Sequence, residues 1–124
     1  VFADGKLIEN ARRIETIARA NLESLLSETD IVAEVRGRGA MLAIEFADRG
    51  TLVPRADLAK EVATRCHAQG VLVLTCGTYS NVIRLLPPLV IDESLLRDGL
   101  TVLHDVIQQV DAAQLRASRQ TVAA

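Results

Sequence analysis

Arg84 is the residue whose type and position most directly suggest chemistry. It lies in the run Val82–Leu86, in which every other residue is apolar and favours β-structure. A guanidinium keeps its charge in a protein, so an arginine inside such a strand needs an anionic or hydrogen-bond-accepting partner. Its planar fork of donors matches a carboxylate, which it can bind through two parallel hydrogen bonds. The pattern therefore indicates either a carboxylate-binding site or an internal ion pair.

Two structural explanations for Arg84 stay open from the sequence. The arginine could pair internally with Glu45, Asp48 or Glu93, or it could extend its charge from a sheet edge into water. The loop over residues 76–81 precedes the strand and contains polar residues and a glycine, as loops that border binding sites often do. That loop favours the ligand-binding explanation.

The G-x-G turn at Gly37–Gly39 and the two histidines are weaker candidates. The turn lacks the third glycine and the following helix of a phosphate-binding loop, so we expect a structural hairpin turn. Arg36 and Arg38 beside it are expected on a solvated or interface face. His67 and His104 fall on separate predicted helices without the spacing of a metal site, so we predict no bound metal.

Cysteine and tyrosine side chains complete the reactive inventory. His67 adjoins Cys66, but neighbours on a helix do not face each other, and Cys76 has no base close by in the sequence. Both cysteines are therefore interpreted as packing thiols rather than nucleophiles. The single tyrosine, Tyr79, could point its hydroxyl into a cleft or anchor its loop. The residues on their own therefore name no catalytic group.

The elements that must position Arg84 follow from apolar periodicity. The pattern predicts a helix over 4–27, hairpin strands at 32–36 and 40–47, a helix over 55–69, strands at 71–74 and 82–86, and a final helix from 92 to 111. This order is typical of an α+β domain with a small, mainly antiparallel sheet and helices packed on it. We expect the domain to cover residues 1–111 and residues 112–124 to form a frayed C-terminal tail.

Two of these elements carry further expectations. The strand over 40–47 is apolar on both faces apart from Glu45, which predicts that both faces are covered or that one packs on a partner. Gly99 lies inside the final helix, where glycine costs about 1 kcal/mol relative to alanine, so close packing is expected there. Gly70 is placed to end the second helix.

Composition limits the class of protein. The chain has 124 residues, 49% of them hydrophobic, a length that fits one domain. Its net charge of -2 argues against a nucleic-acid binder. Aromatic residues make up only 2%, too few for base stacking. No apolar run is long enough to span a membrane. Two cysteines are no disulfide framework, which predicts a cytoplasmic protein.

Two segments, Gly39–Glu45 and Cys76–Leu89, carry a resemblance to a known family. They resemble the C-terminal small domain of class III, pyridoxal-phosphate-dependent aminotransferases, most closely the 4-aminobutyrate branch. The turn at 35–39, the helix-to-strand join at 70–72 and the helical segment at 98–100 follow in family order, so the resemblance covers roughly residues 5–110. It implies the fold of the C-terminal domain of fold-type I enzymes.

The resemblance also implies functional roles. By this resemblance, Arg84 is expected to be the substrate-carboxylate arginine. Ser80 departs from the glycine that relatives often carry, so the Ser80 backbone would be strained if that position needs a positive φ. Neither Lys6 nor Lys60 matches the catalytic lysine, which the family places in a preceding large domain together with the cofactor site. The fragment is thus expected to bind no pyridoxal phosphate, to hold no catalytic residue and to be inactive alone.

In the parent enzyme, the resemblance implies amine transfer from an ω-amino acid to 2-oxoglutarate by a homodimer that binds pyridoxal phosphate. The first residue, Val1, is consistent with a piece of a longer protein. Two alternatives remain: a free-standing module that binds a small carboxylate or a partner without catalysis, and a purely structural dimerisation piece.

Overall fold

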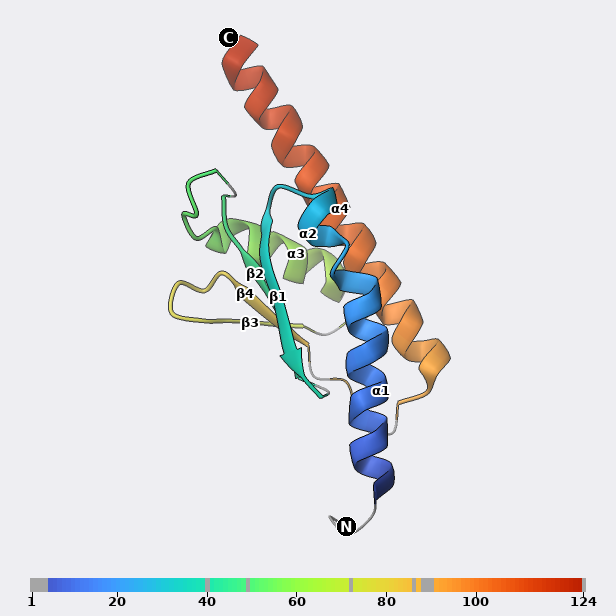
Figure 1. Cartoon of the computed structure of the whole chain (residues 1–124). Coiled ribbons are helices and arrows are strands. Elements are labelled where there is room, and N and C mark those ends of the chain that lie inside the picture. The colour runs from blue at the N-terminus through green and yellow to red at the C-terminus, as the bar shows by residue number, and fades with distance from the viewer. Residues whose placement is uncertain are drawn as a thin grey trace.

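The protein is described by a computed structural model, which covers residues 5–39, 41–48, 50–71, 73–85, 87 and 91–123. Its elements are α1 (Gly5–Leu22), α2 (Leu25–Glu28), β1 (Val32–Arg38), β2 (Met41–Phe46), α3 (Ala56–Ala68), β3 (Leu74–Cys76), β4 (Val82–Leu85) and α4 (Glu93–Ala123). The four strands pair antiparallel in the order β1-β2-β4-β3 (Figure 1). The predicted α+β fold is confirmed.

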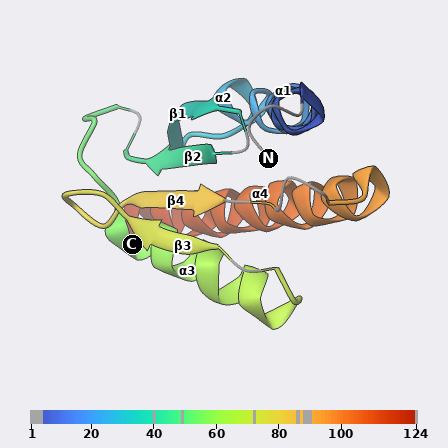
Figure 2. The ribbon, with the colours of Figure 1, turned by 90° about the horizontal axis from the view of Figure 1, so that it is seen from below.

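The sheet has one covered face and one open face. Along β2, Leu42, Ile44 and Phe46 are buried, whereas Met41 on the alternate face is 51% exposed. The helices pack on the face that Leu42 and its alternates occupy, as the view in Figure 2 illustrates. The prediction that both faces of this strand are covered is therefore wrong within the described chain, and the alternative of a partner on the open face remains.

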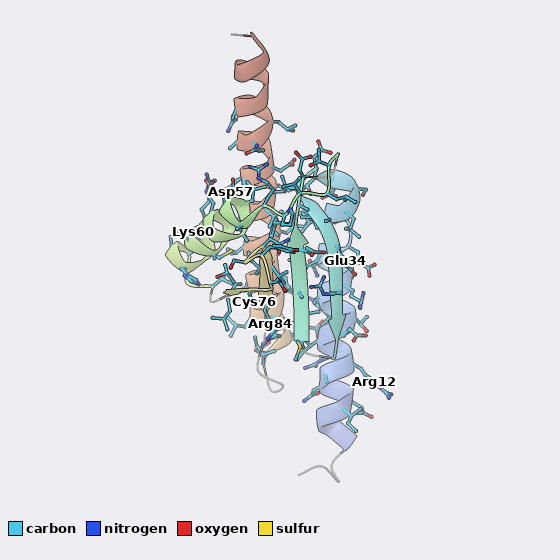
Figure 3. The ribbon with its side chains drawn as sticks, turned by 90° about the vertical axis from the view of Figure 1, so that its left-hand side faces the viewer. Arg12, Glu34, Asp57, Lys60, Cys76 and Arg84 are labelled. Atoms are coloured by element: carbon cyan, nitrogen blue, oxygen red, sulfur yellow. The ribbon has the colours of Figure 1, made fainter. Side chains whose placement is uncertain are left out.

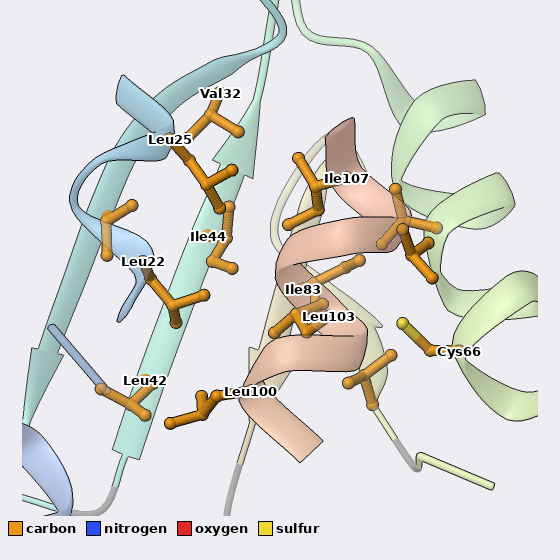
Figure 4. Close-up of a cluster of buried hydrophobic side chains, with 14 of the residues drawn as sticks. Leu22, Leu25, Val32, Leu42, Ile44, Cys66, Ile83, Leu100, Leu103 and Ile107 are labelled. Atoms are coloured by element: carbon orange, nitrogen blue, oxygen red, sulfur yellow. The ribbon is translucent and has the colours of Figure 1, made fainter. Parts of the chain in front are cut away.

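Helix α4 is the centre of the core. It lies between α1 and α3 and contacts both (Figure 4). Its apolar stripe is buried throughout, at Leu96, Leu100, Leu103, Val106, Ile107 and Val110. Matching stripes come from α1 and α3, at Ile14, Ala18, Leu22, Leu58, Ala59, Val62, Ala63 and Cys66. Burial of these i, i+3 and i+4 positions holds the helices on the sheet.

One predicted helix is divided in two, whereas an end of each of the other two predicted helices has a clear local cause. The single helix predicted over 4–27 is divided at 23–24, where the Ser24 hydroxyl lies 3.3 Å from Nε2 of His104 in α4. The second helix ends as predicted, because Gly70 adopts a φ of 84°, which an L-residue rarely adopts. The Asp92 side chain accepts a hydrogen bond from the Ser94 amide (2.9 Å) and caps α4.

The hairpin between β1 and β2 uses its two glycines for different reasons. Gly39 has a φ of 60°, as a turn requires, but Gly37 stays within β1. A Cβ at Gly37 would lie 2.7 Å from the Met41 carbonyl oxygen, so this glycine is needed for close strand approach. Arg19 of α1 donates a hydrogen bond to the Gly37 carbonyl (2.7 Å), which fixes this end of the hairpin to α1.

The strand predicted over 71–74 is misplaced. The third strand begins at Leu74, which is 63% exposed, and Val73 before it is buried; Leu72 lies outside the described residues. The chain needs these residues to leave the end of α3 before it can pair with β4. Strand β3 is consequently a short edge strand rather than a buried one.

Helix α4 is longer than expected. We predicted a frayed end after Asp111, yet the backbone stays helical to Ala123 and extends past the sheet (Figure 1). Alanine, glutamine and arginine are strong helix formers, so the helix continues after its apolar stripe ends. The division into a domain over 1–111 and a tail over 112–124 stays a prediction.

Gly99 offers a direct test of local stability. A Cβ at this position would meet no atom of the described residues within 4 Å, so the close packing that we expected is wrong for the part of the chain that the structure describes. We expect Gly99→Ala to raise the free energy of unfolding of the 124-residue chain by about 0.5–1 kcal/mol, because helical glycine is entropically costly. Urea denaturation measures the change, and Gly37→Ala, which clashes, should be destabilising. A destabilised Gly99→Ala chain would contradict the prediction.

Candidate functional site

Arg84 lies on the open face of the sheet, in the inner strand β4. Its neighbours in the antiparallel register are Ala43 on β2 and Leu74 on β3, and Ala43 in turn pairs with Arg36 on β1. The four residues therefore form one row across the sheet. Since β4 is flanked by strands on both sides, the explanation of Arg84 as a sheet-edge arginine is wrong.

A groove of about 340 Å³ runs over this row. It is lined by Arg36, Gly37, Met41, Ala43, Cys76, Gly77, Val82 and Arg84. Figure 3 labels Arg84 and Cys76 in this part of the sheet. The methyl group of Ala43 is the only side chain between the two arginines in the register, and two strand spacings separate their Cα atoms by about 9–10 Å. The groove thus has a small floor and a cation on either side.

Of the two arginines in the groove, Arg36 is paired with carboxylates and Arg84 is not paired with any described residue. Arg36 Nη1 lies 3.1 Å from Oε2 of Glu34 and 3.5 Å from Oε2 of Glu45. Arg84 is exposed and makes no hydrogen bond or ion pair with the described residues. Arg84 therefore forms none of the internal pairs considered for it, with Glu45, Asp48 or Glu93, and no described residue compensates the charge that it presents to the groove.

The loop before β4 holds its shape through backbone geometry. Gly77 has a φ of 94°, and a Cβ there would lie 2.9 Å from Cγ2 of Val82, so only glycine fits. The Ser80 amide donates to the Gly77 carbonyl (3.1 Å), and Ser80 has a φ of 54°. The strain predicted for a serine at this position is confirmed, since positive φ is uncommon for residues with a Cβ.

Asn81 anchors this loop to the sheet and was missed by the sequence analysis. The buried side-chain amide of Asn81 donates a hydrogen bond to the Phe46 carbonyl (2.9 Å). The backbone carbonyl of Asn81 accepts a hydrogen bond from the Phe46 backbone amide (2.8 Å). Asn81 comes directly before β4, so the two bonds set where the strand carrying Arg84 begins. An asparagine between a loop and a strand gives no sequence signal that separates this role from an ordinary turn residue.

The remaining candidates lie away from the Arg84 groove or take part only in its lining. Burial raises the pKa of the Cys66 thiol to about 11, which fits the packing role predicted for it. Cys76 is half-buried at the groove. Tyr79 is 66% exposed. The two histidines have separate partners. His67 Nε2 lies 3.0 Å from the Val73 carbonyl oxygen, whereas His104 Nε2 lies 3.3 Å from the Ser24 hydroxyl.

Sequence comparison identifies the family to which this sheet, with its covering helices and its arginine-lined groove, belongs. The family model for Aminotransferase class-III matches residues 1–107. The chain belongs to the class-III aminotransferase family. The predicted resemblance is thereby confirmed.

Individual relatives narrow the comparison. The chain is 48% identical over 107 residues to a 4-aminobutyrate aminotransferase of Mycobacterium tuberculosis, which covers 86% of this chain and 24% of the relative. It is 32% identical over 110 residues to the 5-aminovalerate aminotransferase DavT of Pseudomonas putida, covering 89% and 26%. The chain thus spans about a quarter of the length of the curated relatives it matches.

Solved structures agree on the fold. A transaminase from the marine bacterium Virgibacillus superposes with a TM-score of 0.76 at 27% identity, over 87% of this chain and 26% of that chain. An aminotransferase from Bacillus anthracis gives 0.74 at 26% identity, over 83% and 24%. None of the described helices is both long and apolar enough to cross a lipid bilayer.

The described residues do not fit a pyridoxal phosphate site. Such a site needs a lysine to bind the cofactor, and none of the described residues that line the groove around Arg84 is a lysine. Lys60 is exposed on α3, whereas the groove opens on the sheet face that the helices leave uncovered (Figure 3). The Lys6 side chain lies outside the described residues.

Proposed function

We propose that this chain is the C-terminal small domain of an ω-amino acid transaminase of the 4-aminobutyrate type. The observation that carries the proposal is the guanidinium of Arg84, which pairs with no described residue and lies on an inner strand beside a groove with an alanine floor. A guanidinium there can bind a ligand carboxylate through two parallel hydrogen bonds and thereby orient the rest of the molecule. Relatives named for 4-aminobutyrate and 5-aminovalerate, both ω-amino acids, support the substrate class.

A second, larger domain would supply the catalytic parts in this proposal. Pyridoxal phosphate bound there, with its lysine, would carry the amine from the ω-amino acid to 2-oxoglutarate. The open sheet face, with Met41 and Leu74 exposed beside the groove, is where that domain would meet this one. A homodimer and a cytoplasmic location remain predictions for the parent protein.

The test compares two proteins. We expect the protein that joins this chain to a pyridoxal-phosphate-binding domain to convert 4-aminobutyrate and 2-oxoglutarate into the semialdehyde and glutamate. The 124-residue chain with added pyridoxal phosphate should form no glutamate above the protein-free control. Quantifying glutamate by mass spectrometry measures both. Glutamate formation by the 124-residue chain, or none by the joined protein, would contradict the proposal.

A further inference from the structure

Glu45 is placed within reach of both arginines of the groove. It lies two residues beyond Ala43 on the same face of β2, and Ala43 pairs with Arg36 on one side and Arg84 on the other. Glu45 is thus the diagonal neighbour of each arginine. Diagonal neighbours in an antiparallel pair lie about 7–8 Å apart, a distance that long charged side chains span.

The structure has Glu45 with only one of its two possible partners. Its Oε2 lies 3.5 Å from Arg36 Nη1, which also contacts Glu34 at 3.1 Å. No ion pair joins Glu45 to Arg84 in the described structure. The Glu45 side chain is 34% exposed, so packing does not fix its carboxylate in one position.

We propose that Arg36 is a positioning residue that holds Glu45 away from Arg84 and so keeps the Arg84 guanidinium available to a ligand. The inference rests on the proposed function of Arg84 as the carboxylate-binding residue. A carboxylate of the same sheet competes with a ligand without the entropy cost of association, so it must have another partner for Arg84 to stay accessible. Arg36 provides that partner.

The arrangement of side chains around Arg36 supports this role. Arg36 offers a fork of donors and already shares Nη1 between two carboxylates, whereas Ala43, between the arginines, offers only a methyl group. Without the Arg36 guanidinium, Arg84 becomes the nearest cation on the row to Glu45. An exposed ion pair of this kind lowers ligand affinity about two- to fivefold.

A ligand-free measurement tests the positioning directly. The variants Arg36→Ala, Glu45→Gln and their double combination are compared with the unaltered 124-residue chain by NMR of the Arg84 Nε–Hε group. We expect Arg36→Ala to shift this signal, Glu45→Gln to leave it nearly unchanged, and the double variant to restore it. An Arg84 signal that does not move in Arg36→Ala would overturn the inference.

Binding provides the second test, with glutarate as a competitive probe of the protein that joins this chain to its cofactor-binding domain. We expect the inhibition constant to rise about two- to fivefold in Arg36→Ala, because Glu45 then occupies Arg84. Adding Glu45→Gln should restore the value, whereas adding Glu34→Gln, a change of equal charge, should not. Arg36→Lys retains a cation for Glu45 and should stay within twofold of the unaltered protein.

Simple charge effects give a different result. If only net charge mattered, Glu45→Gln alone would tighten glutarate binding as much as Arg36→Ala weakens it, and the inference would be refuted. The proposed function fails separately, because glutarate inhibition that is unchanged in Arg84→Ala would refute carboxylate binding by Arg84 while leaving the NMR result intact.

Discussion

Arg84→Ala is expected to reduce transamination between 4-aminobutyrate and 2-oxoglutarate by about 30- to 1000-fold in kcat/KM, in the protein that joins this chain to its cofactor-binding domain. The range corresponds to losing about 2–4 kcal/mol from a bidentate, charge-assisted hydrogen bond. Arg84→Lys should recover part of the loss, because an ammonium keeps the charge but cannot present two parallel donors. Initial rates with each substrate varied in turn measure the effect.

Two controls make the Arg84 result specific. Arg65→Ala removes an arginine of α3 that pairs with Glu61 at 2.7 Å, so it should leave kcat/KM within twofold. Arg84 has no partner among the described residues, so Arg84→Ala should also leave the unfolding free energy within about 0.5 kcal/mol. A loss of less than threefold in kcat/KM, or an equal loss in Arg65→Ala, would contradict the role of Arg84.

The sequence identified Arg84 as a candidate binding residue because a permanent charge in an apolar strand has few explanations. It could not decide between them, since the answer depends on which strands flank β4. In the structure, β4 lies between β2 and β3, and Glu45 forms an ion pair with Arg36. Cross-strand register brings Ala43 and Arg84, 41 positions apart, into one row, and no local pattern records that pairing.

Local chemistry predicted helices better than strands. The stripes of α3 and α4 are read from one helix at a time, and their end signals at Gly70 and Asp92 act within a few residues. The strand predicted over 71–74 was wrong because an apolar run does not state where pairing begins. Helix α4 was predicted too short because loss of the apolar stripe was read as loss of the helix.

The anchoring residues show a further limit of sequence analysis. Gly37 was predicted as a glycine of the turn, yet its role is the close approach of β1 to Met41 and Leu42. Asn81 was read as part of a polar loop, yet its side chain is buried against the Phe46 backbone. Both roles arise from contacts between segments, so they become visible only when the strands are placed.

Phe46→Ala is expected to lower the free energy of unfolding of the 124-residue chain by about 3–5 kcal/mol. Phe46 is the largest fully buried side chain among the described residues and ends β2 in the core beneath the helices. Natural domains have only about 5–15 kcal/mol of stability, so the variant should be close to unfolding at ambient temperature. Urea denaturation followed by circular dichroism measures the change, with a lower midpoint at an unchanged slope.

Met41→Ala is the matched control for Phe46→Ala, because Met41 is half-exposed on the opposite face of the same strand and should cost less than about 0.5 kcal/mol. A loss below about 1 kcal/mol in Phe46→Ala would contradict a tightly packed core at this site. The loop anchor uses the backbone of Phe46, to which Asn81 bonds, rather than its ring. At temperatures where the parent protein stays folded, Phe46→Ala should therefore keep its glutarate affinity, whereas Arg84→Ala should lose affinity without losing stability.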